Sequence, residues 1–401
     1  MPGANSMDFT YSPLGPGQLR LLRPVAVVDG ISISLEISHF ERDRAPPYAA
    51  VSYTWGEGDE IETLQINRRQ IRVRRNLWSC LHYLGLYARN GMVKYLWVDA
   101  ICIDQSNVAE RNAQVRVMDE IYKNARYVSI WLGLDPRFEH YRDRIEGPIT
   151  TFYASDFNWH EHAKKLADHE YWSRYWVIQE CLLARDVQVH CGENVAAWED
   201  FRVAISTEAK VNLFTYPGDS RTAETLNSRK HGALALLLAR PAVEDFPWQR
   251  PLDELIIHHR HSRCKDPRDR VFALLGLLPL EERRFLERFF PNYSLSEDRV
   301  VVITLAHLQK MNGVRVTTKC RELFQGLGVE SKERRTRLIS AAAKFSYFDY
   351  DITSSPAFRK ALSVYEATMD ESELERLARF GDGGLETIDN ERSTISRCNI
   401  L

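Results

Sequence analysis

Residues 95–105 have the sequence Tyr-Leu-Trp-Val-Asp-Ala-Ile-Cys-Ile-Asp-Gln, a nearly continuous apolar run that carries two carboxylates. Apolar runs of this kind are typical of strands that are buried on both faces, as in a parallel sheet. Asp99 and Asp104 therefore mark the carboxyl end of a buried strand.

Two more strands and two helices are predicted around this run. Residues 49–53 and 128–133 are short apolar segments of the kind that forms strands. After Asn76, which can cap a helix, four apolar residues recur at helical spacing. They are Leu77, Leu81, Leu84 and Ala88.

The second helix is predicted to begin at Asn107, three residues before Glu110, in a capping-box pattern. Its apolar face holds Val115, Met118, Ile121, Tyr122 and Ala125. The alternation of strands and helices predicts an α/β fold with a parallel sheet and flanking helices. Because such sheets bind ligands outside the carboxyl ends of their strands, we expect a site at residues 52–58, 99–105 and 133–137.

The composition divides the 401 residues into two parts. All nine tryptophans lie at or before Trp248, which places a change of character near residues 200–250. We expect residues 10–200 to form the α/β domain and residues 201–401 a mostly helical region. Helices are expected at 298–311 and 358–380, a surface loop at 217–229, and a frayed polar tail at 381–397.

Charge and hydropathy exclude several classes of protein. The formal net charge is -2, so there is no general basic field for nucleic acid. The longest apolar run, at residues 271–280, is about half of the roughly 20 residues that a spanning helix needs. No signal peptide is visible, and the seven cysteines are scattered without a Cys-x-x-Cys pair. We expect a cytoplasmic protein with reduced thiols and without a nucleic-acid or membrane partner.

Several ordered motifs resemble one fungal family. The motifs lie at residues 48–56, 96–105, 110–125, 131–133 and 174–180. Together they resemble the heterokaryon-incompatibility (HET) domain over roughly residues 10–200. Residues 266–276 also resemble a stretch often found downstream in these proteins, and Asp104 stands where many members carry Asn.

The resemblance implies a role in fungal non-self recognition, in which family members trigger cell death. The domain is thought to be similar to the TIR fold, a flavodoxin-like sheet. Enzymatic TIR domains cleave NAD with the glutamate of a Trp-x-x-x-Glu helix, and Trp176 to Glu180 fits that spacing. NAD would be the substrate, with no resident cofactor or metal. The analogy also implies self-association, and an upstream incompatibility sensor as a partner.

The residues themselves support two interpretations of Glu180. Asp168, Trp172, Trp176 and Glu180 are spaced by four, so on one helix they form a stripe that sets the acid beside indole rings. One carboxylate can stabilise the oxocarbenium-like ribose that forms when nicotinamide leaves as a neutral molecule. Alternatively, the tryptophans are core residues and Glu180 pairs at the surface with Arg174 or Arg185.

The other expected site residues lie at the strand ends or, for Trp176, on the predicted helix of Glu180. Ser52, Tyr53, Trp55 and Trp176 would line the pocket, where aromatic rings can stack on a nucleotide. Asp99 and Asp104 can bind ribose hydroxyls, hold Mg²⁺, or brace their loop.

Arg111 can pair with one of these two acids, the interpretation that we favour, or clamp a phosphate. Cys102, within the apolar run, is expected to be inert packing. The cluster His258, His259, His261 and Cys264 matches no zinc module and is expected to be a basic loop or a contact.

The leading hypothesis is an NAD-cleaving cell-death effector with Glu180 as its catalytic carboxylate. The alternative is a non-enzymatic signalling module that nucleates death complexes by self-association. A third reading, a Mg²⁺-dependent phosphoryl-handling enzyme, rests on Asp99 and Asp104. No Gly-x-Gly-x-x-Gly or Walker pattern supports hydride transfer or nucleotide triphosphate hydrolysis.

Overall fold

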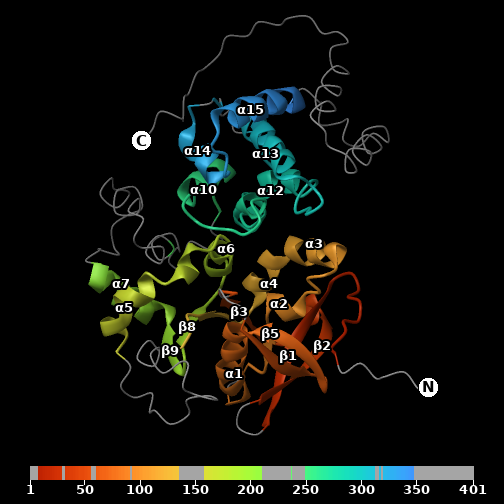
Figure 1. Ribbon diagram of the computed structural model, residues 1–401, viewed down its shortest axis with the longest axis vertical. Helices are drawn as coiled ribbons and strands as arrows, with labels where there is room; N and C mark the ends of the chain where they lie inside the picture. Colours follow the sequence, from red (N-terminus) through yellow and green to blue (C-terminus); the bar gives the residue numbers. More distant parts are fainter. Residues whose placement is uncertain are drawn as a thin grey trace, which may run out of the picture. The chain divides into compact units, whose positions relative to one another are not determined.

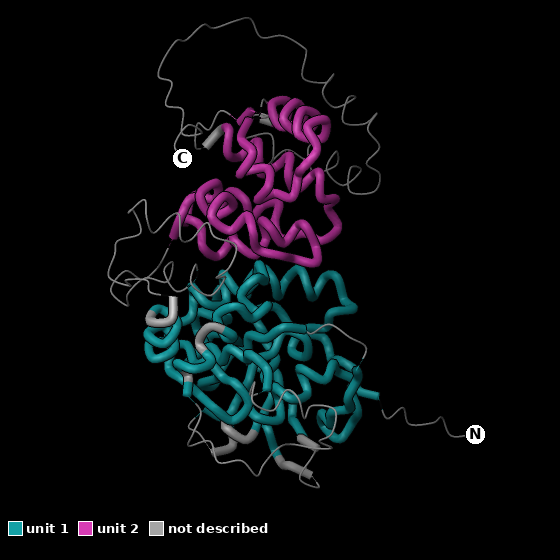
Figure 2. The backbone as a smooth tube through the Cα atoms, turned by 60° about the vertical axis from the view of Figure 1, so that its left-hand side comes forward, with its two compact units in different colours: residues 1–248 teal, residues 249–401 magenta. Residues whose placement is uncertain are grey.

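The computed structural model describes residues 8–28, 32–55, 60–90, 93–134, 158–209, 236, 249–311, 316–317 and 319–346. The chain divides into two compact units, residues 1–248 and residues 249–401 (Figure 2). Among the described residues, the first unit combines a sheet with helices and the second is helical. The predicted fold class is thereby confirmed.

One mixed sheet of nine strands runs through the described part of the first unit (Figure 1). Its spatial order is β5-β4-β2-β1-β6-β3-β7-β8-β9. The bounds are β1 Gln18–Val28, β2 Ser32–Glu41, β3 Tyr48–Tyr53, β4 Ile61–Ile66, β5 Arg69–Arg74, β6 Tyr95–Trp97, β7 Tyr127–Trp131, β8 Val187–Cys191 and β9 Asn194–Ala197.

The parallel core of the sheet consists of β6, β3, β7 and β8. By chain order these are the second, first, third and fourth parallel strands, which is the arrangement of a flavodoxin-like sheet. In that arrangement the winding reverses between the first and third strands, here β3 and β7, and ligands bind outside the strand ends at this point. The three strands predicted from sequence are β3, β6 and β7.

Antiparallel hairpins extend the sheet beyond the predicted strands. β1 pairs with β2, β4 with β5, and β8 with β9. A single residue pair, Leu22 with Leu96, joins the first hairpin to the parallel core. The β4–β5 hairpin is largely exposed and rich in arginine, so it lacks the continuous apolar pattern that reveals a buried strand.

The strand expected across residues 95–103 ends earlier than predicted. After β6 the chain turns into a short helix, α2 (Asp99–Cys102), so the strand prediction for residues 101–103 was wrong. Ile101, Cys102 and Ile103 are nonetheless fully buried. A short segment that is fully buried is apolar throughout, whether it forms a strand or a helical turn. Over so few residues, sequence periodicity cannot distinguish the two.

Helix α1 (Arg75–Asn90) confirms the first predicted helix, and its four predicted apolar residues are all buried. Asn76, however, lies inside this helix rather than capping it. The second predicted helix is two helices, α3 (Val108–Arg116) and α4 (Met118–Asn124), because Val117 leaves helical geometry. Asn107 caps α3 as expected, since its side chain accepts a hydrogen bond from the Glu110 amide.

The remaining helices of the first unit follow β7. They are α5 Trp159–Ala167, the 3-10 helix η4 Glu170–Ser173, α6 Trp176–Leu182 and α7 Trp198–Ala209; a further 3-10 helix, η1, spans Arg42–Arg44 after β2. α7 packs against α5, β8 and β9. The first unit therefore continues past residue 200, where the sequence placed the start of the helical region.

Every described secondary-structure element of the second unit is a helix. They are α10 Leu252–His258, α11 Asp269–Phe272, η6 Leu275–Leu277, α12 Leu280–Leu286, α13 Glu297–Met311, α14 Arg321–Gly326 and α15 Lys332–Ser346. α13 confirms the helix predicted at 298–311. The loop, helix and tail predicted at 217–229, 358–380 and 381–397 lie outside the described residues.

The segment at residues 266–276 braces the second unit. Arg268 binds both carboxylate oxygens of Asp266 and donates hydrogen bonds to the carbonyls of Tyr293 and Leu295. The Tyr293 hydroxyl in turn donates to Asp269. These contacts give this motif a structural role.

Among the described helices, none combines the length and the hydropathy that a membrane span requires.

Gly326, the last residue of α14, offers a test of the second unit. A Cβ atom there would lie 2.4 Å from the Ile256 carbonyl oxygen and 2.5 Å from Ile256 Cγ2 on α10. We expect Gly326→Ala to lower the unfolding free energy by about 1–3 kcal/mol, because the two helices would have to separate. Ser340→Ala, on the exposed side of α15, is the control and should stay within about 0.5 kcal/mol in chemical denaturation. Equal midpoints for the two variants would contradict the close packing.

Candidate functional site

Glu180 lies beside the carboxyl end of β3, next to the point where the winding of the sheet reverses. Ser52, near the end of β3, donates a hydrogen bond to Glu180 Oε2. The Tyr171 hydroxyl lies 2.5 Å from Ser52 Oγ. Because a serine hydroxyl has one proton, Tyr171 donates to Ser52 while Ser52 donates to Glu180. The Ser52 hydroxyl thus joins strand β3 to helix α6, and the Tyr171 hydroxyl links the 3-10 helix η4 to the same group.

Arg174 supplies the positive charge at this position. Its Nη1 atom lies 3.6 Å from Glu180 Oε2, and its guanidinium lies 5.9 Å from the centre of the Tyr171 ring. The residue is extended (φ -71°, ψ 138°) between η4 and α6, which lets the side chain turn toward the carboxylate. The sequence named Arg174 only as a surface partner, whereas the Glu180 side chain of this pair is only 2% exposed.

The pKa of Glu180 is raised above its ordinary value. Burial is the main cause, and the negative charge of Asp99 adds to it. Arg174 and the Ser52 hydrogen bond act in the opposite direction because both favour the ionised carboxylate. The balance leaves Glu180 easier to protonate than an exposed glutamate.

Asp99 is the second carboxylate near Arg174. It is the first residue of α2, two residues after the end of β6, and its Oδ1 atom accepts a hydrogen bond of 2.7 Å from the Ala100 amide. Burial raises the pKa of Asp99, while Arg174, the Ala100 amide and the Trp55 side chain oppose that rise. One guanidinium therefore interacts electrostatically with two carboxylates from different helices, α2 and α6.

Aromatic side chains surround this group. Tyr53, Tyr122 and Tyr171 are buried, and burial raises the pKa of each phenol above its ordinary range. Trp176 is half-buried, while Trp55 is 42% exposed. The site therefore has a buried acid at its centre and a more exposed indole at its edge. Gly56 and Gly58 lie outside the described residues.

The four-residue stripe that led to Glu180 does not lie on one helix, and that prediction was wrong. The chain forms η4, passes through the extended Arg174 and begins α6 at Trp176. Trp172 is core: it stacks on Phe201 and donates a hydrogen bond to the Leu166 carbonyl. Only the spacing from Trp176 to Glu180 is helical.

Asp104 braces its own loop. Its Oδ1 atom accepts hydrogen bonds from the amide and the hydroxyl of Ser106, at 3.1 and 2.6 Å. This is the third of the roles that the sequence allowed. Arg111 is half-buried on α3, and its expected ion pair with Asp99 or Asp104 stays a prediction.

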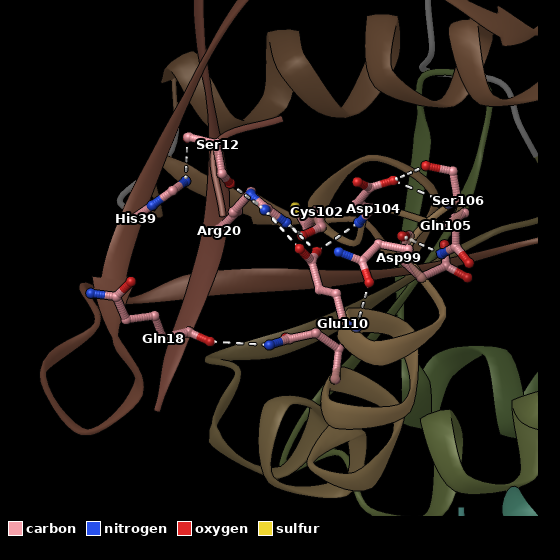
Figure 3. A network of polar contacts seen from close by, with 12 residues as sticks. Ser12, Gln18, Arg20, His39, Asp99, Cys102, Asp104, Gln105, Ser106 and Glu110 are labelled. Atoms are coloured by element: carbon pink, nitrogen blue, oxygen red, sulfur yellow. Dashed lines mark hydrogen bonds and ion pairs between the residues drawn. The ribbon is translucent and has the colours of Figure 1, made fainter. Parts of the chain in front are cut away.

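A buried arginine that sequence reasoning missed holds this loop (Figure 3). Arg20, on β1, is 1% exposed and binds both oxygens of Glu110, at 2.5 and 3.0 Å. It also donates to the carbonyls of Cys102 and Ser12. Glu110 completes the link by accepting a hydrogen bond of 2.7 Å from the Asp104 amide, so only one half of the predicted capping box forms.

Two further contacts fix the strand ends. Gln105 donates a hydrogen bond to the Asp99 carbonyl at 2.9 Å. Asn76 of α1 donates to the Thr54 carbonyl at 2.6 Å and accepts from the Trp131 indole at 3.0 Å. The side chain that was expected to cap α1 instead ties the end of β3 to β7.

The remaining candidates from the sequence lie outside this group. Cys102 is fully buried, and burial raises the pKa of its thiol to about 12, as expected of inert packing. His258 and His259 contact each other edge to face. Among the residues that the structure describes, no three histidine, cysteine, aspartate or glutamate side chains are grouped to hold a metal.

The Arg20–Glu110 pair should be a main source of stability for the loop that carries Asp99. Arg20→Met leaves a buried carboxylate without its partner, so we expect a loss of about 3–5 kcal/mol in urea unfolding. The double variant Arg20→Met/Glu110→Leu removes both charges and should lose less than either single variant. A double variant that loses the sum of the two single losses would contradict a direct ion pair.

Comparison with known proteins agrees with this arrangement. A family model described as "Heterokaryon incompatibility protein (HET)" matches residues 48–180, from the start of β3 to Glu180. "Heterokaryon incompatibility protein 6, OR allele" of Neurospora crassa is 26% identical, over 58% of this chain and 43% of its own length. "Vegetative incompatibility protein HET-E-1" of Podospora anserina is 28% identical over 22% of this chain and 7% of its own length.

The chain thus spans less than half the length of each of these two relatives. No solved structure is significantly similar to it. The matched region nevertheless contains β3, β6, β7, Asp99, Arg174 and Glu180. Residues 48–180 of this chain form a heterokaryon-incompatibility (HET) domain.

Proposed function

We propose that this chain acts in fungal non-self recognition as a trigger of cell death, and that it cleaves the N-glycosidic bond of NAD. The family match and the printed names of the two relatives support the biological role. The chemical role has a separate basis, the surroundings of Glu180.

The observation that carries the proposal is the position of the Glu180 carboxylate. It lies beside the end of β3, where the winding of the parallel strands reverses, and it accepts a hydrogen bond from Ser52 there. Flavodoxin-like sheets bind nucleotides at this position. A carboxylate held in poor solvation there interacts strongly with a positive charge that develops nearby.

The reaction would use one carboxylate. The bond between C1′ of the ribose and the nicotinamide nitrogen breaks, and its electron pair neutralises the ring cation, so nicotinamide leaves without needing a proton. Glu180 stabilises the positive charge that develops on the ribose. A water oxygen then bonds to C1′ and releases one proton, which gives ADP-ribose.

The surrounding residues would bind the rest of the nucleotide. Asp99 can accept hydrogen bonds from ribose hydroxyls, and Trp55 and Trp176 present indole rings to flat ligand rings. Ser52 and Tyr53 lie at the strand end itself. We propose binding roles for these five residues, and for Asp104 after α2 and Arg111 on α3.

Glu180 is only 2% exposed, so substrate can reach it only if covering side chains move. The side chain of Arg174, its ion-pair partner, is 22% exposed. Self-association that shifts Arg174 or the Tyr171–Ser52 link would open the site. This would make cleavage depend on assembly, which suits a protein that kills its own cell.

A second candidate function rests on the same observation. Glu180 is already paired with Ser52 and Arg174, an arrangement that also serves a purely structural carboxylate. In that case the domain would signal by self-association alone. The two candidates separate in a direct assay.

The first test is nicotinamide release from NAD by the purified full chain, at concentrations that promote assembly. We expect release by the unaltered protein and a loss of at least about 100-fold in Glu180→Gln, because the neutral amide cannot stabilise the cation. Glu170→Gln, an exposed acid on η4, is the matched control and should retain activity. Absence of release in the unaltered protein would leave only the signalling candidate.

The pH profile of the same reaction tests the environment of Glu180. Since only the ionised carboxylate stabilises the cation, the rate should fall as the pH falls through the raised pKa of Glu180. Arg174→Gln removes the positive neighbour, so it should move this acid limb to higher pH. Asp99→Asn removes a negative neighbour and should move it to lower pH. Shifts in the same direction in both variants would contradict the assignment.

A further inference from the structure

Strand β5 forms one edge of the sheet and is strongly basic. Residues 68–75 contain five arginines. Arg68, Arg69, Arg72 and Arg74 are exposed, whereas the half-buried Arg75 pairs with Glu60 at 3.2 Å. β4 covers one side of β5, and no strand of the described residues pairs along its other side.

The backbone of β5 shows which residues face outward. The Gln70 carbonyl accepts a hydrogen bond of 2.8 Å from the Phe9 amide, on the side away from β4. Because backbone groups alternate along a strand, those of Arg72 and Arg74 point outward as well. The Arg75 amide bonds to Glu60 on the β4 side, which agrees with this alternation.

The side chains of Arg72 and Arg74 share the exposed face of the hairpin. Val73, between them, is buried on the opposite face. Successive residues of a strand rise by about 3.3 Å, so the two arginine Cα atoms are separated by roughly 7 Å along the edge. An added strand would place every second side chain directly opposite them.

One peptide segment already uses this edge. Asp8 pairs with Gln70 in a parallel bridge, which is confined to that one residue pair. Beyond Gln70 the edge continues through Arg72 and Arg74. Charged side chains on an edge strand discourage pairing with apolar strands, and the same charges favour an acidic one.

We propose that the outer edge of β5 beyond Gln70, at Arg72 and Arg74, is a docking site for an extended acidic peptide of a partner protein. The peptide adds as a further strand, with its backbone paired to Arg72 and Arg74. Acidic residues at alternate positions lie opposite the two guanidinium groups. The equal rise of the two strands matches the spacing of the charges.

The test uses the full chain and a capped nonapeptide of alternating glutamate and valine, with binding followed by isothermal titration. We expect saturable binding to the unaltered protein that weakens as salt is added. Arg72→Gln/Arg74→Gln should weaken binding about tenfold, since each cross-strand charge pair contributes a few-fold. The matched control is Arg116→Gln/Arg126→Gln, which removes two exposed arginines elsewhere and should bind like the unaltered protein.

Two altered peptides separate strand pairing from simple charge attraction. A peptide that is N-methylated at every backbone amide keeps every charge but loses its backbone donors, and it should bind at least tenfold more weakly. Arg72→Glu/Arg74→Glu should instead bind a peptide of alternating lysine and valine. Thermal melts of all variants check that they are folded.

Three results would overturn the proposal. They are no binding of the acidic peptide by the unaltered protein, equal binding of the N-methylated peptide, and equal binding by the Arg72→Gln/Arg74→Gln variant. Tighter binding of a short RNA than of the acidic peptide at equal salt would likewise show that the edge recognises another class of partner.

Discussion

A single guanidinium, that of Arg174, faces two carboxylates that the fold has removed from water. A buried carboxylate is costly unless a positive charge or hydrogen bonds compensate for it. Asp99 comes from the loop after β6, Glu180 from α6, and Arg174 from the extended link before α6. The charge balance therefore joins segments that lie as far apart in sequence as Asp99 and Glu180. Each of them has to be in place before the others are stable.

A second buried ion pair supports the first at a distance. Arg20 and Glu110 fix the loop from Cys102 to Asp104, and that loop holds Asp99 through Gln105. The β1–β2 hairpin, which precedes the matched family region, therefore contributes to the geometry of the candidate site. The region that the family motifs cover, residues 48–180, is therefore shorter than the structural unit that holds those motifs in position.

The parallel core could be predicted from sequence because its strands are buried on both faces and so are continuously apolar. The same reasoning placed Ser52, Asp99 and Glu180 near strand ends, since chain order and parallel direction determine where those ends meet. Arg20 could not be assigned in this way, and Arg174 was named only as one of two possible surface partners of Glu180. Their partners depend on side-chain directions, and an arginine that pairs across 90 residues looks the same in sequence as one in solvent. Val117 and Arg174 interrupt helices without any proline or glycine, so those breaks left no local signal.

The pairing of β1 with β6 through Leu22 and Leu96 has a practical consequence for truncated versions of this protein. A fragment cut to residues 48–180 keeps every family motif but loses the hairpin that covers β6. β6 would then become an edge strand. Its residues Leu96 and Trp97 lack the charges that protect natural edge strands from pairing with other chains. Such a fragment would stick to its own copies and precipitate, and any clustering it displayed would reflect the missing hairpin rather than the biology of the intact chain.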